Sequence, residues 1–420
     1  MADHGLTKQS LADAWDAFHA AQTEALGWMT NSERFKAEPQ HRARAYHTMM
    51  EALAMAYNFA VAPRMAHPRL VVNTGWQTDI YTLGQNGPDL FYGVTFLDGR
   101  QTYRLSGQYN DSVLILCQVI NHLSGHPDSK AIGSHDLSTF DIAEDGSFEF
   151  VLGGEEREGN WMPLDTNSRY NFLLFRRFTP DWNMKPADLK IARISEIPND
   201  YYYDDEFDEE RMAERIGMAT LFLKYLIRDF NMNLFEWYLG NSSKWVEDPT
   251  PGSPEPTGFN ELAFLPGTIT SEVGSSFSNY AMAIFDLKDD EALILELDQL
   301  PDGVYWSLQL GDVWSRSLNL FGQTSISMHH AAVDGDGGFR AVVSKYDPGV
   351  KNWLDTQGRK QGAIVFRNYR AQRQPVPASK LVKLSEVRDN LPEDTTLFTP
   401  EQRKEAVARR REGLLALHGE

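Results

Sequence analysis

Apolar side chains in the N-terminal part of the chain recur at the spacing of an α-helix. A first predicted helix follows Ser10, a candidate cap, and its apolar face consists of Leu11, Trp15, Phe18, Ala25 and Met29. Pro39 marks the first turn of a second predicted helix, whose apolar face consists of Tyr46, Met49, Met50, Leu53, Tyr57 and Ala60. We therefore expect a helical N-terminal layer over residues 1–75.

After residue 75 the pattern changes to short alternating apolar segments that are separated by turn residues. Asp98–Gly99 is one such separator and is typical of a β-hairpin. The alternation predicts a first β domain over residues 76–182 and a second over residues 264–374. Helices beside antiparallel strands make an α+β fold the expected class.

The segment between the two β domains, residues 183–263, returns to helical spacing. Its apolar positions from Met212 to Phe230 predict a long helix, and residues 247–258 form a Pro/Gly-rich linker. An acidic run at 204–210 precedes the helix. Its negative charges could interact favourably with the helix dipole, or they could bind a cation. The tail, 375–420, predicts a short extended piece and a charged C-terminal helix.

One stretch of the chain occurs twice, starting at Asp145 and again at Asp336. Each copy contains Asp-Gly, an apolar strand, Asn-Trp, a polar loop and a second strand with an arginine. The two aspartates are 191 residues apart, a period that indicates duplication of a whole β domain. We expect the repeated residues to be core tryptophans, turn asparagines and strand arginines paired with acids, at Trp161, Trp353, Asn160, Asn352, Arg176 and Arg367.

Composition and charge narrow the classes of function. The chain has 420 residues, 42% of them apolar, and a formal net charge of −19. This charge argues against nucleic acid and anionic membranes as partners. The first residues lack the features of a secretion signal, and no apolar run approaches the length of a membrane span. We expect a cytoplasmic protein, for which a homodimer is compatible with the sequence.

Several motif classes are missing from the sequence. It contains no phosphate-binding P-loop, no dinucleotide-binding glycine motif, no zinc-protease or paired-cysteine motif and no nucleophile elbow. Cys117 is the single cysteine, and its apolar surroundings predict a buried, inert thiol. We therefore expect no cofactor and no metal, which leaves proton-transfer chemistry by His, Tyr, Asp and Arg.

Histidine provides one candidate base. His329 and His330 are adjacent, so on a strand they would point to opposite faces and could not chelate one metal together. Either could still face a cavity as a general base or be a structural histidine, and we take His329 as the candidate. His122 and His126 lie in a loop-like segment, where the spacing is weak evidence for a metal site.

Features that occur once are better functional candidates than the repeated ones, because the repeated residues serve both folds. This criterion selects two aromatic clusters, one in each β domain. Candidate catalytic residues are Tyr92, Arg104, Tyr305 and His329, and candidate substrate-binding residues are Phe91, Tyr103, Trp306, Trp314 and Arg316. Aromatic core packing is the alternative interpretation of each aromatic residue.

The strings NGPDLFYGVTFLDGRQTYRLSG, GNWMPLDTNSRYNFLLFRRF, YWSLQLGDVWSRSL and DPGVKNWLDTQGRKQGAIVFRNY resemble a known family. So do PVP and NLPEDTTLFTPEQR near the end. The chain is similar, from about residue 35 to 410, to the bacterial domain-of-unknown-function family 1214. The resemblance implies a jelly-roll-like β-sandwich for each repeat. It implies no catalytic residues.

The leading functional hypothesis is a cofactor-independent enzyme of the lyase type, acting on a hydrophobic or aromatic alcohol in bacterial catabolism. Elimination, retro-aldol cleavage, hydration or isomerisation would each need one base for a hydroxyl proton. Arg104 or Arg316 could stabilise the developing oxyanion. The alternatives are a non-catalytic module that binds carbohydrate or another small molecule, and a glycoside hydrolase, although no spacing identifies a carboxylate pair.

Overall fold

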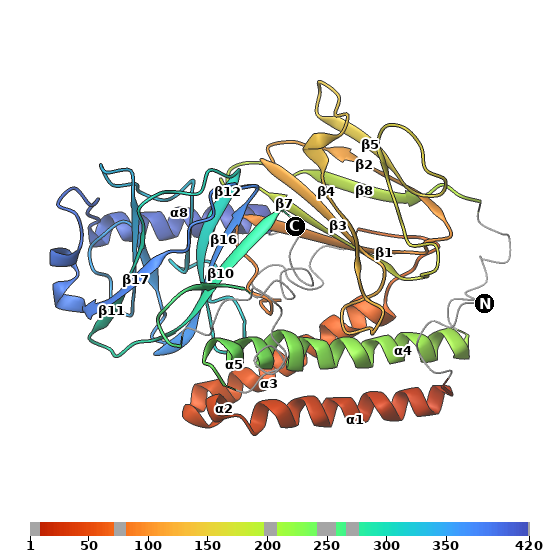
Figure 1. Cartoon of the computed structure of the whole chain (residues 1–420), viewed down its shortest axis with the longest axis horizontal. Helices are drawn as coiled ribbons and strands as arrows, with labels where there is room; N and C mark the ends of the chain where they lie inside the picture. Colours follow the sequence, from red (N-terminus) through yellow and green to blue (C-terminus); the bar gives the residue numbers. More distant parts are fainter. Residues whose placement is uncertain (1–8, 71–80, 197–207, 242–257, 266–276, 419–420) are drawn as a thin grey trace. The chain divides into compact units, whose positions relative to one another are not determined.

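A computed structural model describes residues 9–70, 81–196, 208–241, 258–265 and 277–418. The chain divides into two compact units. Unit 1 comprises residues 1–77, 91–178 and 186–232, and unit 2 comprises residues 78–90, 179–185 and 233–420. Each unit contains one β-sandwich and helices, which confirms the α+β class (Figure 1).

The sandwich of unit 1 consists of two four-stranded sheets. The first has the order β1-β7-β3-β4, with β1 at Leu90–Leu97, β7 at Asn171–Phe178, β3 at Leu114–Ile120 and β4 at Ala131–Asp136. The second has the order β6-β5-β2-β8, with β6 at Trp161–Met162, β5 at Ser147–Gly153, β2 at Thr102–Gln108 and β8 at Asp188–Arg193. Its core draws alternate side chains from both sheets, among them Leu105, Cys117 and Phe150.

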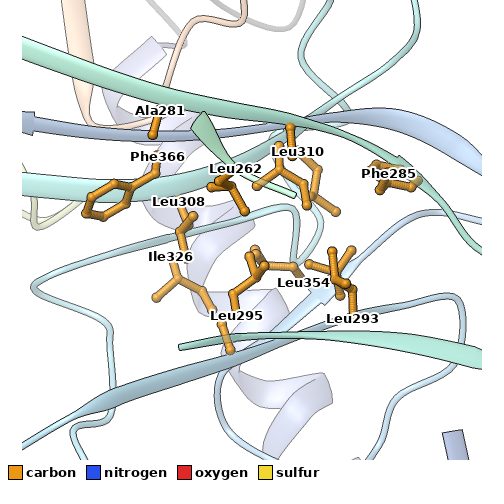
Figure 2. Packing of buried hydrophobic residues seen from close by; sticks show 14 of the residues in the cluster. Leu262, Ala281, Phe285, Leu293, Leu295, Leu308, Leu310, Ile326, Leu354 and Phe366 are labelled. Carbon is orange, nitrogen blue, oxygen red and sulfur yellow. The ribbon is translucent and has the colours of Figure 1, made fainter. Parts of the chain in front are cut away.

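The sandwich of unit 2 repeats this arrangement. One sheet has the order β13-β12-β16-β10-β9, with β13 at Ser325–Ser327, β12 at Tyr305–Gly311, β16 at Gln361–Tyr369, β10 at Ser278–Asp286 and β9 at Ala263–Phe264. The other has the order β15-β14-β11-β17, with β15 at Trp353–Asp355, β14 at Phe339–Ser344, β11 at Glu291–Leu297 and β17 at Ala378–Lys383. Figure 2 shows Leu293 and Leu295 of β11 facing Leu308 and Leu310 of β12 across this core.

The strand orders confirm the duplication. β1-β7-β3-β4 corresponds to β10-β16-β12-β13, and β6-β5-β2-β8 corresponds to β15-β14-β11-β17. The short strand that carries the repeated tryptophan pairs parallel in both copies, β6 with β5 and β15 with β14. β8 and β17, which lie after the predicted boundaries at 182 and 374, complete the second sheet of each sandwich.

The repeated asparagines make the same hydrogen bonds in both copies. Asn160 accepts from the backbone N–H of Asp141 at 2.9 Å and donates to its carbonyl at 2.8 Å. Asn352 accepts from the N–H of Ala332 at 2.9 Å and donates to its carbonyl at 2.7 Å. These bonds differ from the predicted local turn bonds, because each one joins the asparagine to a segment about 20 residues away in sequence.

The repeated arginines show a partner other than the expected acid. Arg176 donates to the Gln118 side chain at 3.1 Å, and Arg367 donates to the Gln309 side chain at 2.8 Å. In both copies the glutamine lies on the neighbouring strand, β3 or β12. In each copy the glutamine amide oxygen accepts from the buried guanidinium, so the repeated pair serves the fold.

The helices of unit 1 begin with α1 (Leu11–Thr30), which Ser10 caps by accepting from the N–H of Asp13 at 3.1 Å. α2 (Glu33–Ala37), α3 (Pro39–Ala56) and the π-helical turn η1 (Tyr57–Val61) follow. α4 (Glu209–Lys224) packs along α1 through a cluster that includes Ala14, Ala213 and Ile216, and it continues into η5 (Tyr225–Asn233) (Figure 1). Phe59 of η1 stacks on Phe222 and lies 5.8 Å from Phe172 of β7, which fixes the helices to the sheet.

The predicted apolar faces of the N-terminal helices are only partly confirmed. Ala25, Met29 and Met49 are buried as expected. Trp15 is 55% exposed and Met50 is 66% exposed, because other positions are buried: alanines are three of the four buried residues of α1 and three of the eight of α3. Small side chains allow close helix packing, and an apolar-face count based on large residues misses them.

Unit 2 also contains α5 (Leu234–Tyr238), the short 3₁₀ turns η6 (Leu384–Glu386) and η7 (Arg388–Asn390), and the C-terminal helix α8 (Pro400–His418). Thr399 accepts from the N–H of Gln402 at 3.2 Å, and the Gln402 side chain accepts from the N–H of Thr399 at 2.8 Å. This reciprocal capping box explains where α8 begins. The predicted charged C-terminal helix is therefore confirmed.

Some sequence-based predictions fall on residues outside the described ranges. These are the first eight residues, most of the acidic run at 204–210 and most of the linker at 247–258. Asp208, at the end of that run, caps α4 by accepting from the N–H of Arg211 at 2.8 Å. Within the described ranges, no helix combines the length and the apolar character needed to cross a bilayer. The cytoplasmic location stays a prediction.

Candidate functional site

Unit 2 contains a pocket of about 700 Å³. Three segments line it: the loop at 181–183, strand β13 with the turn that follows it, and α8. Lys351 and Phe398 complete the wall. The volume falls within the range of small-molecule sites, about 300–1,000 Å³.

Both candidate histidines lie in this pocket. They occupy a turn after β13 and not a strand, and the N–H of His330 donates to the carbonyl of Ser327 at 2.9 Å. The expectation that they point to opposite sides is therefore wrong, because the turn brings both rings to the same pocket with centroids 5.0 Å apart. His329 Nε2 lies 3.5 Å from Asp181 Oδ2, and its side chain is 43% exposed.

His330 has a more enclosed position. Its ring stacks on Trp182 with centroids 4.1 Å apart, and its Nδ1 lies 3.1 Å from the Ser327 hydroxyl. Trp182 is held in turn by Asp89, which accepts from its indole N–H at 3.0 Å. Asp89 also accepts from the Tyr305 hydroxyl at 2.9 Å. A buried carboxylate thus fixes the indole that forms part of the pocket wall.

Helix α8 closes the pocket through two buried arginines. Arg403 is paired with Asp347 at 2.9 Å. Arg410 is 3% exposed and donates to the carbonyls of Leu320 and Ser325 at 2.6 and 3.0 Å and to the Ser325 hydroxyl at 2.7 Å. Burial lowers the pKa of Arg410 to about 10, so the guanidinium stays charged at neutral pH. Its central carbon lies 5.0 Å from the Trp182 ring centroid.

Electrostatics distinguish the pocket's titratable groups. A hydrogen bond from the backbone of Asn183 lowers the pKa of Asp181, and the nearby histidines lower it further, so Asp181 stays a carboxylate at neutral pH. Burial lowers the pKa of His330, so this ring is neutral at neutral pH. Among the described residues, no group of three or more His, Cys, Asp or Glu side chains could hold a metal ion.

The pKa of His330 predicts how stability depends on pH. Burial disfavours the charged His330 ring more strongly than Asp89 and Asp181 favour it. His329 and Arg410 also disfavour the charged ring. The folded-state pKa lies below the unfolded value of about 6.5, so the unfolded chain binds more protons in that window. The stabilisation is present above pH 6.5 and is lost as the pH falls through the folded-state pKa. His330→Gln should make the free energy of unfolding, measured by urea denaturation, depend less on pH below pH 6.5. An unchanged slope would contradict this assignment.

Gly413 of α8 allows the helix to approach Trp182. A Cβ at this position would lie 2.6 Å from the Trp182 Cβ, closer than real contacts. Gly413→Ala should therefore lower the free energy of unfolding by about 1–3 kcal/mol, measured by urea denaturation. In an unobstructed helix the same change would stabilise by about 0.5–1 kcal/mol. A gain would therefore contradict the close contact, and exposed Ala408→Ser is the control, expected within about 0.5 kcal/mol.

The other site residues predicted in unit 2 do not line this pocket. Tyr305 is 1% exposed and donates to Asp89, which in turn holds Trp182 of the pocket wall. Trp306 packs in the sandwich core, with its ring 5.0 Å from that of Phe339. Trp314 and Arg316 lie in the turn after β12, where Trp314 is fully buried and the Arg316 guanidinium lies 3.9 Å from Asp312. Of the site residues that were predicted in unit 2, His329 is the one that lines the pocket.

The residues predicted in unit 1 lie on β1 and β2. Tyr103 is buried, and its hydroxyl accepts from the N–H of Asp98 at 3.0 Å and donates to the Met65 carbonyl at 3.2 Å. Phe91 is 7% exposed and Tyr92 is half-buried. Arg104 is exposed on the other face of β2 and lies 3.8 Å from Glu149. The predicted opposite orientation of Tyr103 and Arg104 is confirmed.

Sequence patterns did not identify Asp181, Trp182 and Arg410 in the pocket wall, or Asp89, which binds Trp182. Asp89 ends the NGPD turn, whose aspartate resembles an ordinary turn residue. Arg410 is the middle of three consecutive arginines in the predicted charged helix, where a solvent-exposed face is the ordinary interpretation. The interruption of that face is visible in the sequence, since Ala406, Gly413 and Leu414 lie at helical spacing from Arg410.

Comparisons with known proteins agree with this architecture. A crystal structure of an uncharacterized protein from Burkholderia cenocepacia is 24% identical, covers 89% of this chain and 98% of that chain, and superposes with a TM-score of 0.76. This likeness shows the fold alone. A protein from Vibrio parahaemolyticus, 12% identical over 80% of this chain and 98% of its own, has a TM-score of 0.45, too low to support an argument.

No curated protein matches the sequence. One family, described as "Protein of unknown function (DUF1214)", matches residues 94–181 and 285–373. These two matches fall on the two sandwiches, from β1 to the end of β7 and from β10 to the end of β16. The two sandwiches are therefore domains of the DUF1214 family, one in each repeat of the chain.

Proposed function

We propose that unit 2 is a lyase-type enzyme in which His329 acts as a general base on a small hydroxylated substrate. The observation that carries the proposal is the His329–Asp181 pair, 3.5 Å apart at a pocket large enough for a small molecule. The ring is half-exposed, so a substrate hydroxyl can reach it. The carboxylate is ionised, so it favours the imidazolium that forms when a proton is taken.

The proposed reaction needs no group beyond these side chains. His329 takes the hydroxyl proton, the oxygen forms a carbonyl, and the adjacent carbon–carbon bond breaks. The electron pair of that bond moves to the leaving carbon, and the imidazolium returns its proton there. Retro-aldol cleavage of this kind is balanced in atoms and electrons. The stacked Trp182 and His330 rings offer a flat apolar wall for an aromatic or hydrophobic substrate body.

A second candidate is non-catalytic binding of a small molecule in the same pocket. The volume and the aromatic wall favour it to the same extent, since neither requires proton transfer. The two functions differ in what His329 contributes. In a binding module its loss should change affinity only, whereas in an enzyme it should abolish turnover of a ligand that still binds.

The test is turnover of hydroxylated aromatic compounds, with products separated by liquid chromatography and identified by mass. His329→Gln should lower kcat by about 10²–10⁴-fold with a small change in KM. His19→Gln, an exposed histidine of α1, is the control and should leave kcat unchanged. Ligand binding without turnover of any compound would favour the binding module. Turnover that survives His329→Gln would overturn the assignment of the base.

A further inference from the structure

The pocket carries an excess of cations without carboxylate partners. Among the described residues, Lys351, Arg409 and Arg410 line it with no Asp or Glu within salt-bridge distance. Arg403 is neutralised by Asp347, and Asp181 faces His329. Glu412 is then the remaining acid in the wall. The pocket wall thus has three cations and one carboxylate without a salt bridge. Its local charge is positive, although the chain has a formal net charge of −19.

Arg410 is the most informative of these cations, because a buried charge needs compensation. Its side chain is more than nine-tenths buried, and its hydrogen-bond acceptors in the protein are two carbonyls and one hydroxyl. A guanidinium has five N–H groups, and these three bonds leave two. Buried Asp89 favours this charge electrostatically, but the cost of burial is larger, because the pKa of Arg410 still falls to about 10. An anion that accepts the two remaining N–H groups in the pocket would add the missing compensation.

We infer that the pocket takes an organic anion, with its charged group held by Arg410, Lys351 and Arg409 and its planar body against Trp182 and His330. Fork-shaped guanidinium groups suit a carboxylate or a phosphate, which share this chemistry. The inference rests on the pocket used for the proposed function and deepens it. It names the substrate class as a hydroxylated aromatic acid in place of a neutral alcohol.

The test compares ligands that differ only in charge. Benzoate, benzamide, benzyl alcohol and phenyl phosphate are titrated into the full chain at 0.15 M salt, and binding is followed by calorimetry. Benzoate should bind at least about 10-fold more tightly than benzamide and benzyl alcohol, since hydrogen bonds to a charged group are about twice as strong. Phenyl phosphate shows which of the two anion types the pocket prefers.

Two matched double variants assign the effect to the pocket. Lys351→Gln/Arg409→Gln removes two lining cations and should weaken benzoate about 10-fold while leaving benzamide unchanged. Lys404→Gln/Arg411→Gln removes the same charge from exposed positions of α8 outside the pocket wall and should leave both affinities unchanged. Arg410→Met tests the buried guanidinium directly, with circular dichroism as the check on folding. If it fails to fold, the comparison of the lining double variant with the control double variant still decides.

The outcomes separate this inference from the proposed function. Equal affinity for benzoate and benzamide, or equal loss in the two double variants, would overturn the anion site. His329→Gln could still abolish turnover of a neutral alcohol in that case. Charge-selective binding that the lining pair controls, without turnover of any hydroxylated acid, would support the anion site and contradict the enzyme.

Discussion

Trp306→Ala is expected to lower the free energy of unfolding of unit 2 by about 3–5 kcal/mol. Trp306 is 2% exposed, and its ring packs against Phe339 at 5.0 Å and Phe366 at 6.3 Å inside the sandwich. Truncation removes the contacts of the whole indole and leaves a cavity that neighbouring strands cannot close. Urea unfolding with pulse proteolysis measures the loss, because fragment patterns can distinguish the two units.

Trp15→Ala is the matched control for this prediction. Trp15 lies on α1 of unit 1 and is 55% exposed, so its loss should change stability by no more than about 0.5 kcal/mol. Trp306 was predicted to bind substrate, and the two roles make different predictions. If Trp306 is a core residue, activity should fall in proportion to the folded fraction. A fully stable Trp306→Ala protein would contradict the core assignment.

The duplicated fold could be predicted from the sequence because the signal is redundant. Asp-Gly, Asn-Trp and strand arginine occur twice at one period, so each copy supports the interpretation of the other. The backbone hydrogen bonds of Asn160 and Asn352 show why these residues recur, since each joins the same two segments of its sandwich. Local patterns of this kind are sufficient where strands and turns are close in sequence.

The pocket could be predicted only in part, because its residues are far apart in sequence. His329 was identified from its chemistry. Asp181 comes from the loop after β7, and Arg410 from a helix that begins more than 200 residues later. No periodicity connects them, and burial of an arginine depends on how α8 packs. Aromatic residues were also ambiguous, since Trp306 in the core and Trp182 in the pocket look alike in the sequence.

The copies differ where the pocket lies. At the period of 191, His329 corresponds to Ser138 and Tyr305 corresponds to Leu114. Leu114 is an apolar residue of β3 in unit 1, and Ser138 binds the side chain of Asp136 in a short turn. The repeat thus supplies the scaffold twice and the histidines once. Unique features were the better functional candidates for this reason, although core aromatic residues passed the same criterion.

Asp89→Ala should have the second large effect, a loss of about 2–4 kcal/mol in the free energy of unfolding of unit 2. Asp89 is 1% exposed and accepts from Tyr305 and Trp182, which come from β12 and from the loop after β7. Alanine removes the acceptor that both donors share, and hydrogen bonds to a buried charge contribute about 1.5–3 kcal/mol each. Urea unfolding measures the loss. Exposed Asp298→Ala is the control, expected within about 0.5 kcal/mol.

The same variant tests how the pocket wall is held. Asp89 fixes the indole on which His330 stacks, so its removal should release Trp182 and weaken every planar ligand, charged or neutral. Loss of a lining cation should weaken anions only. Asp89→Asn keeps one acceptor oxygen, so it should fall between wild type and alanine in stability. If Asp89→Ala keeps full stability and affinity, Asp89 does not position Trp182, and the wall must be held by the contact of Gly413 with Trp182 and the stack of His330.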